Sequence, residues 1–515
     1  GSEKPCIYSV PNRKQSYDEF MKDISADELY DRMIQYGMFA EKLPPVFDGA
    51  SFLAYCKDPS HPVFADKWHD YVRYDSMRNI NIPRPLGIPT PMGHERLCKC
   101  LKDEWLNLQQ YFQTTTANQK HIVSRIHIRK ANDTDALFQM NYSNWRDDGT
   151  PEPDLLMGKQ YMVSADMSKC FPSIYTHAIP WALVGKPIAK QNATKTNQWY
   201  NQIDHFAQNS KNGETHSLLI GPHTSNLLSE IILCKIDETL CKKWDYTRHI
   251  DDFCCFVKTH DDADQFLVDL NACLKEYGLS LNHKKTKIEA LPAAMTEQWV
   301  RKLQKQILPF GKFHDYVDYH EVQVFIDFCV DLMSENKDNA SILLYGMKVL
   351  KGQKLTQNAQ QYFTKMSVSL ALIYPYIVPL LDECVFTPCS TDPAEIEKYL
   401  NLIYEHYFAK NYFEACSFAL YYATKYDFEI SSFDVNTVIS KEDCIFDLMA
   451  LIYCRKRKQS ADQKTLKNYA KQLKANGVFD EFWLFAYESL SVGLVTDDWE
   501  GMKKANVSFL KPEYQ

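Results

Sequence analysis

Several features that mark whole classes of protein are missing from this chain of 515 residues. Its sixteen cysteines include no Cys-x-x-Cys pair, which argues against structural zinc and favours reduced, mostly buried thiols in a cytosolic protein. The longest apolar runs, such as residues 367–381, contain proline and fall short of a membrane span. The N-terminus lacks a basic start followed by an apolar core, so we expect no signal peptide. A cytoplasmic protein with no membrane partner is the expectation.

An excess of basic residues is also missing. The formal net charge is −8, and neither half of the chain is basic overall. Proteins that grip long nucleic-acid duplexes usually carry a basic surface excess. Any contact with nucleic acid must therefore be local.

What the chain does contain is a globular composition, with 45% hydrophobic and 24% charged residues. Residues 1–75 are predicted to be an N-terminal helical segment. Residues 76–310 alternate short β-type runs with helices, which is typical of an α+β fold. Residues 311–515 are predicted to be nearly all helical, and the helix lengths suggest stacked pairs without a clean sequence period.

Two adjacent aspartates, Asp251 and Asp252, interrupt an apolar β-forming run in the segment RHIDDFCCF, residues 248–256. Like charges beside apolar strands resist desolvation unless cations or hydrogen bonds compensate them. One reading is a polar hairpin turn, because Asp is common in turns. The other is a divalent-metal site, which needs a third acid elsewhere.

The third acid is Asp166, which follows a short apolar strand over residues 161–165. Together with the Asp251-Asp252 hairpin it fits the arrangement that two-metal nucleotidyl transfer requires. We therefore predict that Asp166, Asp251 and Asp252 bind Mg²⁺, with Mn²⁺ as an alternative, and that Asp252 is the more peripheral ligand.

The order and spacing of five motifs over residues 80–290 resemble the palm and fingers of reverse transcriptases. The resemblance implies a fingers and palm fold, an antiparallel sheet with packed helices. It also implies that Phe171 is the steric gate against a ribose 2′-hydroxyl and that Lys285 lies near the incoming triphosphate. Gly221 and Ser225 are implied to be nucleotide-binding. The motifs are DMSKCFPSIYTH at 166–177, LLIGPHTSNLLSEIIL at 218–233 with Gly221 and Ser225 matching, RHIDDF at 248–253, GLSLNHKKTKI at 278–288 and IPRPLGIPTPMGHERL at 82–97.

Three arginines are candidate cations for the triphosphate. Arg84 lies in the fingers-like segment, and Arg125 and Arg129 alternate with apolar residues in SRIHIRK. A strand there would put Arg125 and Arg129 on one face. The alternative is an ordinary solvated strand face.

The departures from the family pattern fall on the parts that hold template and primer. His249 stands for the usual Tyr, Ile220 for Gln, Asn226 for Pro and Glu230 for Asn, and no clear thumb sequence follows Lys287. An apolar Ile220 in place of the Gln that approaches the templating base suggests weakened template reading.

With its long helical C-terminal half, the chain resembles the abortive-infection reverse transcriptases of bacterial antiphage defence. The segment IGPHTSNLLSEI, residues 220–231, and the chain length are similar to prophage-encoded members. The resemblance implies template-independent, protein-primed DNA synthesis from dNTPs, with a single-stranded DNA product covalently attached to the protein. It also implies a helical-repeat (HEAT-like) C-terminal domain and a homo-oligomer, a trimer or hexamer, in the bacterial cytoplasm.

Protein priming needs a hydroxyl on a segment that can reach the metals. Tyr8 and Tyr17 are candidates because they lie near the N-terminus, where chain ends are often mobile, and Tyr8 ranks first.

A basic helix is predicted in residues 455–474. Its stripe of Lys464, Lys467, Lys471 and Lys474 lies apart from an apolar stripe of Leu466, Ala470 and Leu473. The stripe is either a solvated face or a path for emerging single-stranded DNA.

The sequence thus predicts a magnesium-dependent, protein-primed DNA polymerase used in phage defence by abortive infection. Two alternatives are a templated RNA-dependent DNA polymerase and a non-catalytic protein that senses a phage component.

Overall fold

The computed structural model describes residues 15–79, 82–130, 138, 140, 148–294, 297–307 and 315–515. The chain forms two compact units, each assembled from segments that are separated along the sequence. The first comprises the residues up to Phe39 together with Cys56–Asp70 and Pro89–Ala293, and the second comprises Ala40–Tyr55, Tyr71–Ile88 and Ala294–Gln515. The units interleave along the chain, whereas the sequence suggests contiguous segments. The domain limits at residues 75 and 310 remain predictions.

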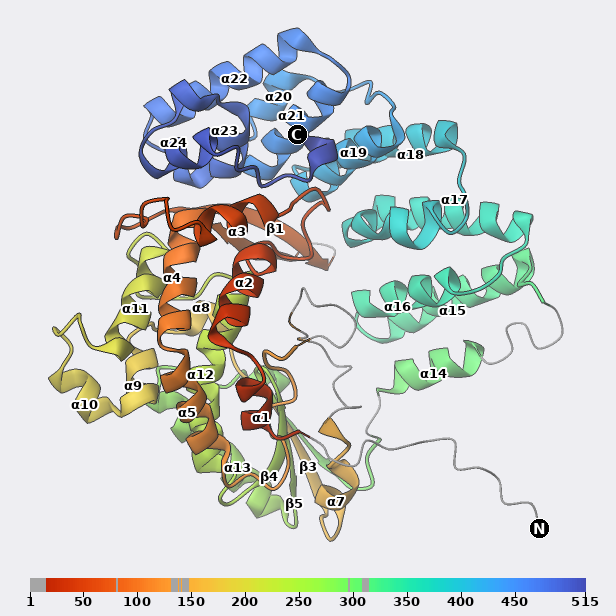
Figure 1. The fold of residues 1–515 in the computed structure, drawn as a ribbon. Coiled ribbons are helices and arrows are strands. Elements are labelled where there is room, and N and C mark those ends of the chain that lie inside the picture. The colour runs from red at the N-terminus through yellow and green to blue at the C-terminus, as the bar shows by residue number, and fades with distance from the viewer. Residues whose placement is uncertain are drawn as a thin grey trace, which may run out of the picture. The chain divides into compact units, whose positions relative to one another are not determined.

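The first unit is built on a four-stranded antiparallel sheet with the strand order β4-β5-β3-β6. The strands are β3 (Tyr161–Asp166), β4 (Asp245–His249), β5 (Asp252–Val257) and β6 (Lys287–Ala290). Strand β3 lies inside the sheet, because it pairs with β5 on one side and with β6 on the other. Helix α13 (His260–Glu276) packs against β3 and β5 (Figure 1).

Helix α12 (His223–Leu240) forms the core of the first unit. Buried side chains occur around most of its circumference, as expected for a helix enclosed by neighbours. It packs against α5, α9 and α13. The surrounding helices are α1 (Tyr17–Lys22), α2 (Ala26–Tyr36), α4 (Pro91–Asp103), α5 (Trp105–Thr116), α7 (Glu152–Leu156), α8 (Cys170–Ser173), α9 (Ala178–Val184), α10 (Lys186–Gln191) and α11 (Trp199–Asn209).

The second unit is largely helical. Figure 1 shows its helices following one another from green to blue, and successive helices pack in pairs, such as α15 with α16 and α18 with α19. The predicted fold class, an α+β region followed by a helical C-terminal region, is confirmed. The α-helices of the second unit include α14 (Gln298–Ile307), α15 (Tyr319–Glu335), α16 (Ala340–Lys351), α17 (Gln357–Ile373), α18 (Pro393–Ala409), α19 (Phe413–Tyr426), α20 (Val435–Ile439), α21 (Cys444–Lys456), α22 (Ser460–Ala475), α23 (Trp483–Ser489) and α24 (Asp497–Lys504).

Early segments of the chain complete this second unit. Strands β1 (Tyr71–Asn79) and β2 (Ile82–Pro89) form a two-stranded sheet, and β1 packs against α19, α21 and α23. The backbone around Phe47 pairs with the C-terminal segment, since Asp48 N donates to Phe509 O at 2.9 Å and Lys511 N to Val46 O at 2.8 Å.

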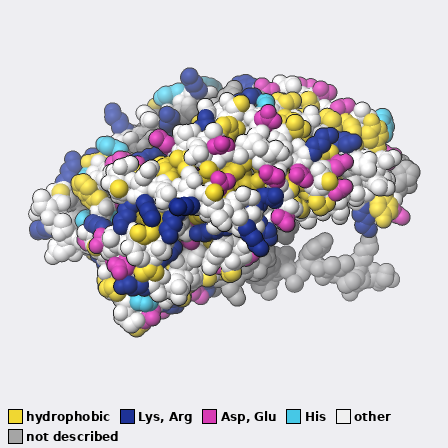
Figure 2. All heavy atoms as spheres, turned by 90° about the horizontal axis from the view of Figure 1, so that it is seen from above, with side chains coloured by type: hydrophobic (Ala, Val, Ile, Leu, Met, Phe, Trp, Pro, Cys, Tyr) yellow, Lys and Arg dark blue, Asp and Glu magenta, His cyan; other side chains and the backbone are white. Residues whose placement is uncertain are grey.

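The described surface carries charges of both signs. On the face shown in Figure 2, the Lys and Arg side chains are interspersed with Asp and Glu side chains. Among the described residues, none of the helices has both the length and the apolar character needed to cross a membrane.

Candidate active site

Asp166 is fixed by the central strand of the sheet. It ends β3 and pairs in register with Asp252, the first residue of β5. The backbone beyond it is held from both sides, because Met167 N donates to Asp251 O at 3.1 Å and Asn282 N donates to Asp166 O at 2.7 Å. The Asp166 carboxylate therefore projects from a backbone with little freedom.

Asp251 and Asp252 are presented by a tight hairpin between β4 and β5. His249 pairs with Asp252, which leaves Ile250 and Asp251 as a two-residue turn. Ile250 has a φ of 56°, an outlier for a β-branched residue. Positive φ at the first turn residue is the type II′ pattern, for which glycine is the usual residue. The turn stores strain on the order of 1–3 kcal/mol.

The three aspartates converge. One carboxylate oxygen of each lies within 4.8 Å of the other two. Asp252 is at the exposed rim, yet partial desolvation and the negative charges of Asp251 and Asp166 raise its pKa to about 7. Carboxylates this close repel one another unless a cation compensates them. The cluster therefore fits a hard divalent cation such as Mg²⁺, and Mn²⁺ shares the same preference for carboxylate oxygens.

Lys285 lies beside this cluster, at the end of the short 3₁₀ turn η2 (His283–Lys285). Its Nζ is 3.4 Å from Asp166 Oδ2, and 61% of its side chain is exposed, so the amino group can swing from Asp166 toward an incoming anion. An open pocket of about 330 Å³ adjoins the two. It is lined by Ser164, Ala165, Asp166, His249, Asp252, Phe253, Cys254 and Lys285.

Phe171 is buried in the short helix α8, five residues after Asp166. Its carbonyl oxygen accepts a hydrogen bond from Leu218 N at 2.9 Å, so the chain leading to Gly221 runs along α8. Gly221 has a φ of 127°, and Ser225 is buried in the first turn of α12. The nucleotide-binding roles of these three residues stay predictions.

The arginines proposed for the triphosphate are placed differently from one another. Arg125 is buried and donates to the carbonyl oxygens of Ile122 and Gly149. Arg129 is buried against Asp148, with Nη1 2.5 Å from Oδ1. Their segment forms isolated bridges instead of the regular strand considered from the sequence, because buried polar partners hold it. Arg84 is exposed on β2, in the second unit, and its role stays a prediction.

His249 was identified from the sequence only as a departure from Tyr, yet it lines the pocket beside Asp252. Burial lowers its pKa to about 4, and the positive charges of Arg125 and Arg248 act in the same direction. The imidazole is therefore neutral near pH 7, with one ring nitrogen a hydrogen-bond donor and the other an acceptor.

The two candidate priming tyrosines differ in what can be said of them. Tyr8 lies outside the described residues. Tyr17 is 2% exposed, and its hydroxyl donates to Glu230 Oε2 at 2.8 Å. The expectation that Tyr17 is on a mobile end is corrected, because α1 packs on α5 and buries the ring. Burial also raises the pKa of Tyr17 well above its usual value.

The basic helix of the second unit is α22. Leu466, Ala470 and Leu473 form its buried face, as the sequence predicts. Lys464 and Lys471 are exposed, Lys467 is half-buried, and Lys474 Nζ donates to Leu494 O at 2.6 Å. Lys474 therefore has a structural contact, and a DNA path along the stripe stays a prediction.

A buried ionic cluster beneath the hairpin was missed from the sequence. Arg248 lies between Glu230 and Asp237 of α12, with Nη1 2.8 Å from Glu230 Oε1 and Nη2 2.7 Å from Asp237 Oδ2. The available signal was the spacing of Glu230 and Asp237 by seven positions, which places two acids on one face of an apolar helix.

Comparison with known proteins agrees with this geometry for part of the chain. Residues 94–319 match the family described as reverse transcriptase (RNA-dependent DNA polymerase). No curated protein matches the sequence. The matched region contains the three aspartates, Lys285 and the whole sheet.

Similar solved structures include yeast telomerases. Apo telomerase from Candida tropicalis is 11% identical, with a TM-score of 0.32, over 72% of this chain and 67% of that one. A form truncated from the C-terminal domain is 14% identical, with a TM-score of 0.29, over 46% and 53%. Telomerase from Candida albicans with a fragment of telomeric RNA is 12% identical, with a TM-score of 0.28, over 69% and 65%.

The chain thus spans between about half and two thirds of the length of these telomerases. At such TM-scores the likeness says nothing about what this chain binds. The family match is consistent with the chemistry that the three aspartates can support. Residues 94–319 match a reverse transcriptase domain, which is an enzyme domain of the nucleotidyltransferase, DNA polymerase type.

Proposed function

We propose that this chain is a phage-defence DNA polymerase of the abortive-infection type, which extends a hydroxyl of its own chain with dNTPs and needs no template. The observation that carries the catalytic part is the convergence of Asp166, Asp251 and Asp252 beside Lys285 in one open pocket. Protein priming, template independence and a role in defence rest on the resemblance of the sequence to that family.

Each side chain has a part in this proposal. Asp166 and Asp251, with Asp252 at the rim, would hold the divalent cations. Bound there, two such cations would lower the pKa of the attacking hydroxyl and stabilise the pyrophosphate leaving group. Lys285 would move from Asp166 to the triphosphate and neutralise part of its charge. Phe171 would exclude a 2′-hydroxyl, which makes dNTPs the expected substrates.

Template independence is supported by Ile220. It precedes Gly221 in the segment where the family has a Gln that approaches the templating base. An apolar side chain cannot replace the hydrogen bonds of an amide at that place.

The test is incubation of the purified protein with Mg²⁺ and labelled dNTPs, without template or primer. Label that stays on denatured protein and resists RNase is the expected result. Asp251→Asn should reduce it by at least about 100-fold, because a metal ligand supplies several kcal/mol at the transition state. Asp261→Asn, an exposed change on α13, is the matched control and should leave labelling intact.

A templated RNA-dependent DNA polymerase is the second candidate, and the match of residues 94–319 to the reverse transcriptase (RNA-dependent DNA polymerase) family favours it. Synthesis that begins only when RNA and an annealed primer are added, with a product complementary to that RNA, would establish this candidate instead. No incorporation of label under either condition would favour a non-catalytic protein that senses a phage component.

A further inference from the structure

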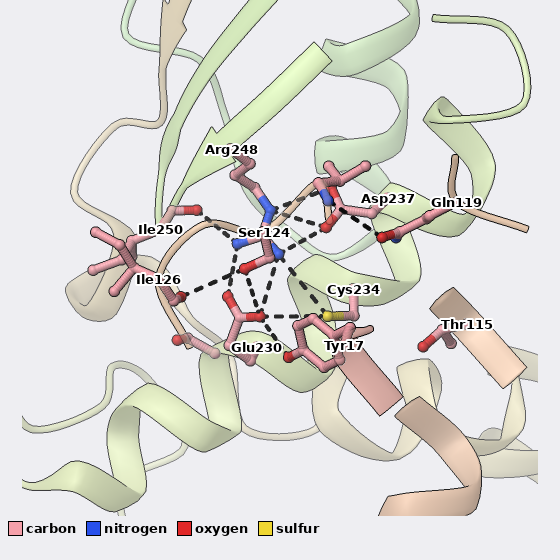
Figure 3. A network of polar contacts seen from close by, with 12 residues as sticks. Tyr17, Thr115, Gln119, Ser124, Ile126, Glu230, Cys234, Asp237, Arg248 and Ile250 are labelled. Carbon is pink, nitrogen blue, oxygen red and sulfur yellow. Dashed lines mark hydrogen bonds and ion pairs between the residues drawn. The ribbon is translucent and has the colours of Figure 1, made fainter. Parts of the chain in front are cut away.

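The Arg248 guanidinium is the best-connected polar group beneath the hairpin. The side chain is fully buried, and each of its nitrogens has a partner (Figure 3). Nε and Nη2 donate to Asp237, Nη1 and Nη2 donate to Glu230, and Nη1 also donates to the carbonyl oxygen of Ile250 at 2.9 Å. One buried side chain therefore joins helix α12 to the turn that carries Asp251.

This arrangement is not explained by stability alone. Taking three charged groups out of water is energetically costly, and apolar replacements of such clusters are often neutral or stabilising. Burial alone would lower the pKa of Arg248, but Asp237 and Glu230 raise it well above its usual value. The Arg248 guanidinium therefore stays charged. Its planar fork of N–H donors can bind several acceptors at once.

The two-residue turn of Ile250 and Asp251 has a backbone conformation that other contacts must stabilise. Ile250 holds a φ of 56°, which a β-branched residue adopts only under constraint. Its carbonyl oxygen is one of the acceptors of Arg248, while the next residue's carbonyl, Asp251 O, accepts from Met167 N. The backbone of Arg248 is itself anchored, because its N donates to Val123 O and its O accepts from Arg125 N, both at 2.7 Å.

We propose that Arg248 is a positioning residue for the metal-binding aspartates. By anchoring the Ile250 carbonyl to α12, it keeps the turn in the left-handed conformation that places Asp251 beside Asp166. The inference rests on the proposed metal-dependent function of those aspartates.

The support extends to the N-terminal helix. Tyr17 of α1 and Ser124 both donate to Glu230 Oε2, at 2.8 and 3.0 Å (Figure 3). These two hydrogen bonds fix the carboxylate that in turn orients Nη1 of Arg248 toward Ile250.

The first test is Arg248→Lys, which keeps the charge but cannot make the fork. Binding of Mn²⁺, followed by electron paramagnetic resonance, should weaken on the order of tenfold or more, as for loss of groups that orient metal ligands. The kcat of labelling should fall while the KM for dNTP stays unchanged. Arg96→Lys is the matched control, because the guanidinium of Arg96 lies over the ring of Phe206, a helix residue of the same unit. Its Mn²⁺ affinity should equal that of the unaltered protein.

The second test is rescue by Ile250→Gly in the Arg248→Lys background. Glycine adopts a positive φ at no steric cost, so the turn no longer depends on the guanidinium. The double variant should regain at least about threefold in Mn²⁺ affinity over Arg248→Lys. A merely structural role for Arg248 would leave the double variant as weak as the single one, and that outcome would overturn the proposal.

Circular dichroism and melting temperature establish whether Arg248→Lys folds. If Arg248→Lys does not fold, Glu230→Gln is the variant that tests the proposal. This change removes the carboxylate charge that orients Nη1 of Arg248 but leaves an amide oxygen in place. A severalfold loss of Mn²⁺ affinity in Glu230→Gln would support the proposal, and an unchanged Mn²⁺ affinity would contradict it. Failure of the proposed function is a separate outcome, seen when Asp251→Asn binds Mn²⁺ as well as the unaltered protein does.

Discussion

Lys285 and Asp166 form an ion pair at the edge of the aspartate cluster. The 3.4 Å separation and the high exposure of Lys285 describe an amino group that is held near a carboxylate without being locked. Such a group can exchange one anion for another when a triphosphate arrives. The Coulomb energy of an exposed pair is modest, so the exchange costs little.

Lys285→Ala should raise the KM for dNTP on the order of tenfold, because one charged contact to the triphosphate is lost. Mn²⁺ affinity should hold or improve, since Lys285 no longer competes for Asp166. Steady-state labelling and Mn²⁺ titration check both parts. Lys284→Ala, in the same 3₁₀ turn, is the control, and an equal effect of the two changes would contradict the role.

Phe171→Val should relax the choice between deoxy- and ribonucleotides. A smaller side chain leaves room for a 2′-hydroxyl, so the preference for dATP over ATP should fall about tenfold or more. The measurement is the ratio of kcat/KM for the two nucleotides. Val is used instead of Ala because Phe171 is buried, and truncation to Ala would cost about 3–5 kcal/mol of stability. An unchanged ratio would show that Phe171 does not face the sugar.

Among single residues, the sequence predicts the charged groups of the site better than it predicts the side chains that hold those groups in place. Asp166, Asp251 and Lys285 sit in short motifs whose residue types already imply the chemistry, and the structure brings all three together. Arg248, Glu230 and Asp237 carry no such motif. Their ion pairs depend on how α12 packs against the sheet, so the sequence alone shows Glu230 only as a departure from Asn and does not reveal its contact with Arg248.

Among the elements, helices α19 and α21 carry acids in an apolar setting. Glu414 of α19 is 3% exposed, and its Oε1 accepts a hydrogen bond from Met77 N of β1 at 3.0 Å. Burial raises the pKa of Glu414 to about 7, and burial also raises the pKa of Asp443, at the N-cap of α21, to about 6. These helices therefore bind protons in the folded state that an unfolded chain releases near pH 4.

The stability of this helical unit should therefore fall as the pH rises. A carboxyl with a raised folded pKa binds more protons when folded, so its contribution is greatest below about pH 4 and is lost as the pH passes about 7. Glu414→Gln should flatten the decline of melting temperature between pH 4 and 7, by the equivalent of about 2–3 kcal/mol. Glu397→Gln, an exposed change on α18, should reproduce the slope of the unaltered protein. If Glu414→Gln keeps that slope too, Glu414 does not titrate in this window.

The spacing of apolar residues predicts the helices of the C-terminal half well, but it predicts irregular segments poorly. Leu466, Ala470 and Leu473 recur at helical spacing and form the buried face of α22. The alternation around Arg125 and Arg129 suggested a strand, but side-chain partners such as Asp148 and the Gly149 carbonyl take the place of a ladder. Those partners are distant in sequence, and no local pattern reveals them.

For the whole molecule, the interleaving of the two units has a direct experimental consequence. Residues 40–55 and 71–88 belong to the helical unit, and their buried side chains include Phe52, whose ring centroid lies 5.3 Å from that of Phe509. A fragment that ends after the reverse transcriptase region keeps these segments but lacks their partners.

A fragment of residues 1–310 should therefore aggregate or expose apolar surface, although it contains every predicted catalytic residue. Expression, size-exclusion chromatography and binding of a hydrophobic dye test this expectation. Co-expression with residues 311–515 should restore a soluble complex, because the missing partners are supplied in trans. A monodisperse, protease-resistant 1–310 fragment would contradict it.

The pairing of Phe47 with Leu510 also sets an order of events during translation. At about 5–20 residues per second, the ribosome needs roughly 20 to 90 s after residue 47 before the partner residue is made. Throughout that interval the segment around Val46 and Phe52 lacks its C-terminal partners Phe509 and Lys511. The helical unit can close only once nearly all of the chain described here has been made, so a nascent or prematurely terminated chain has a natural target for chaperones and proteases.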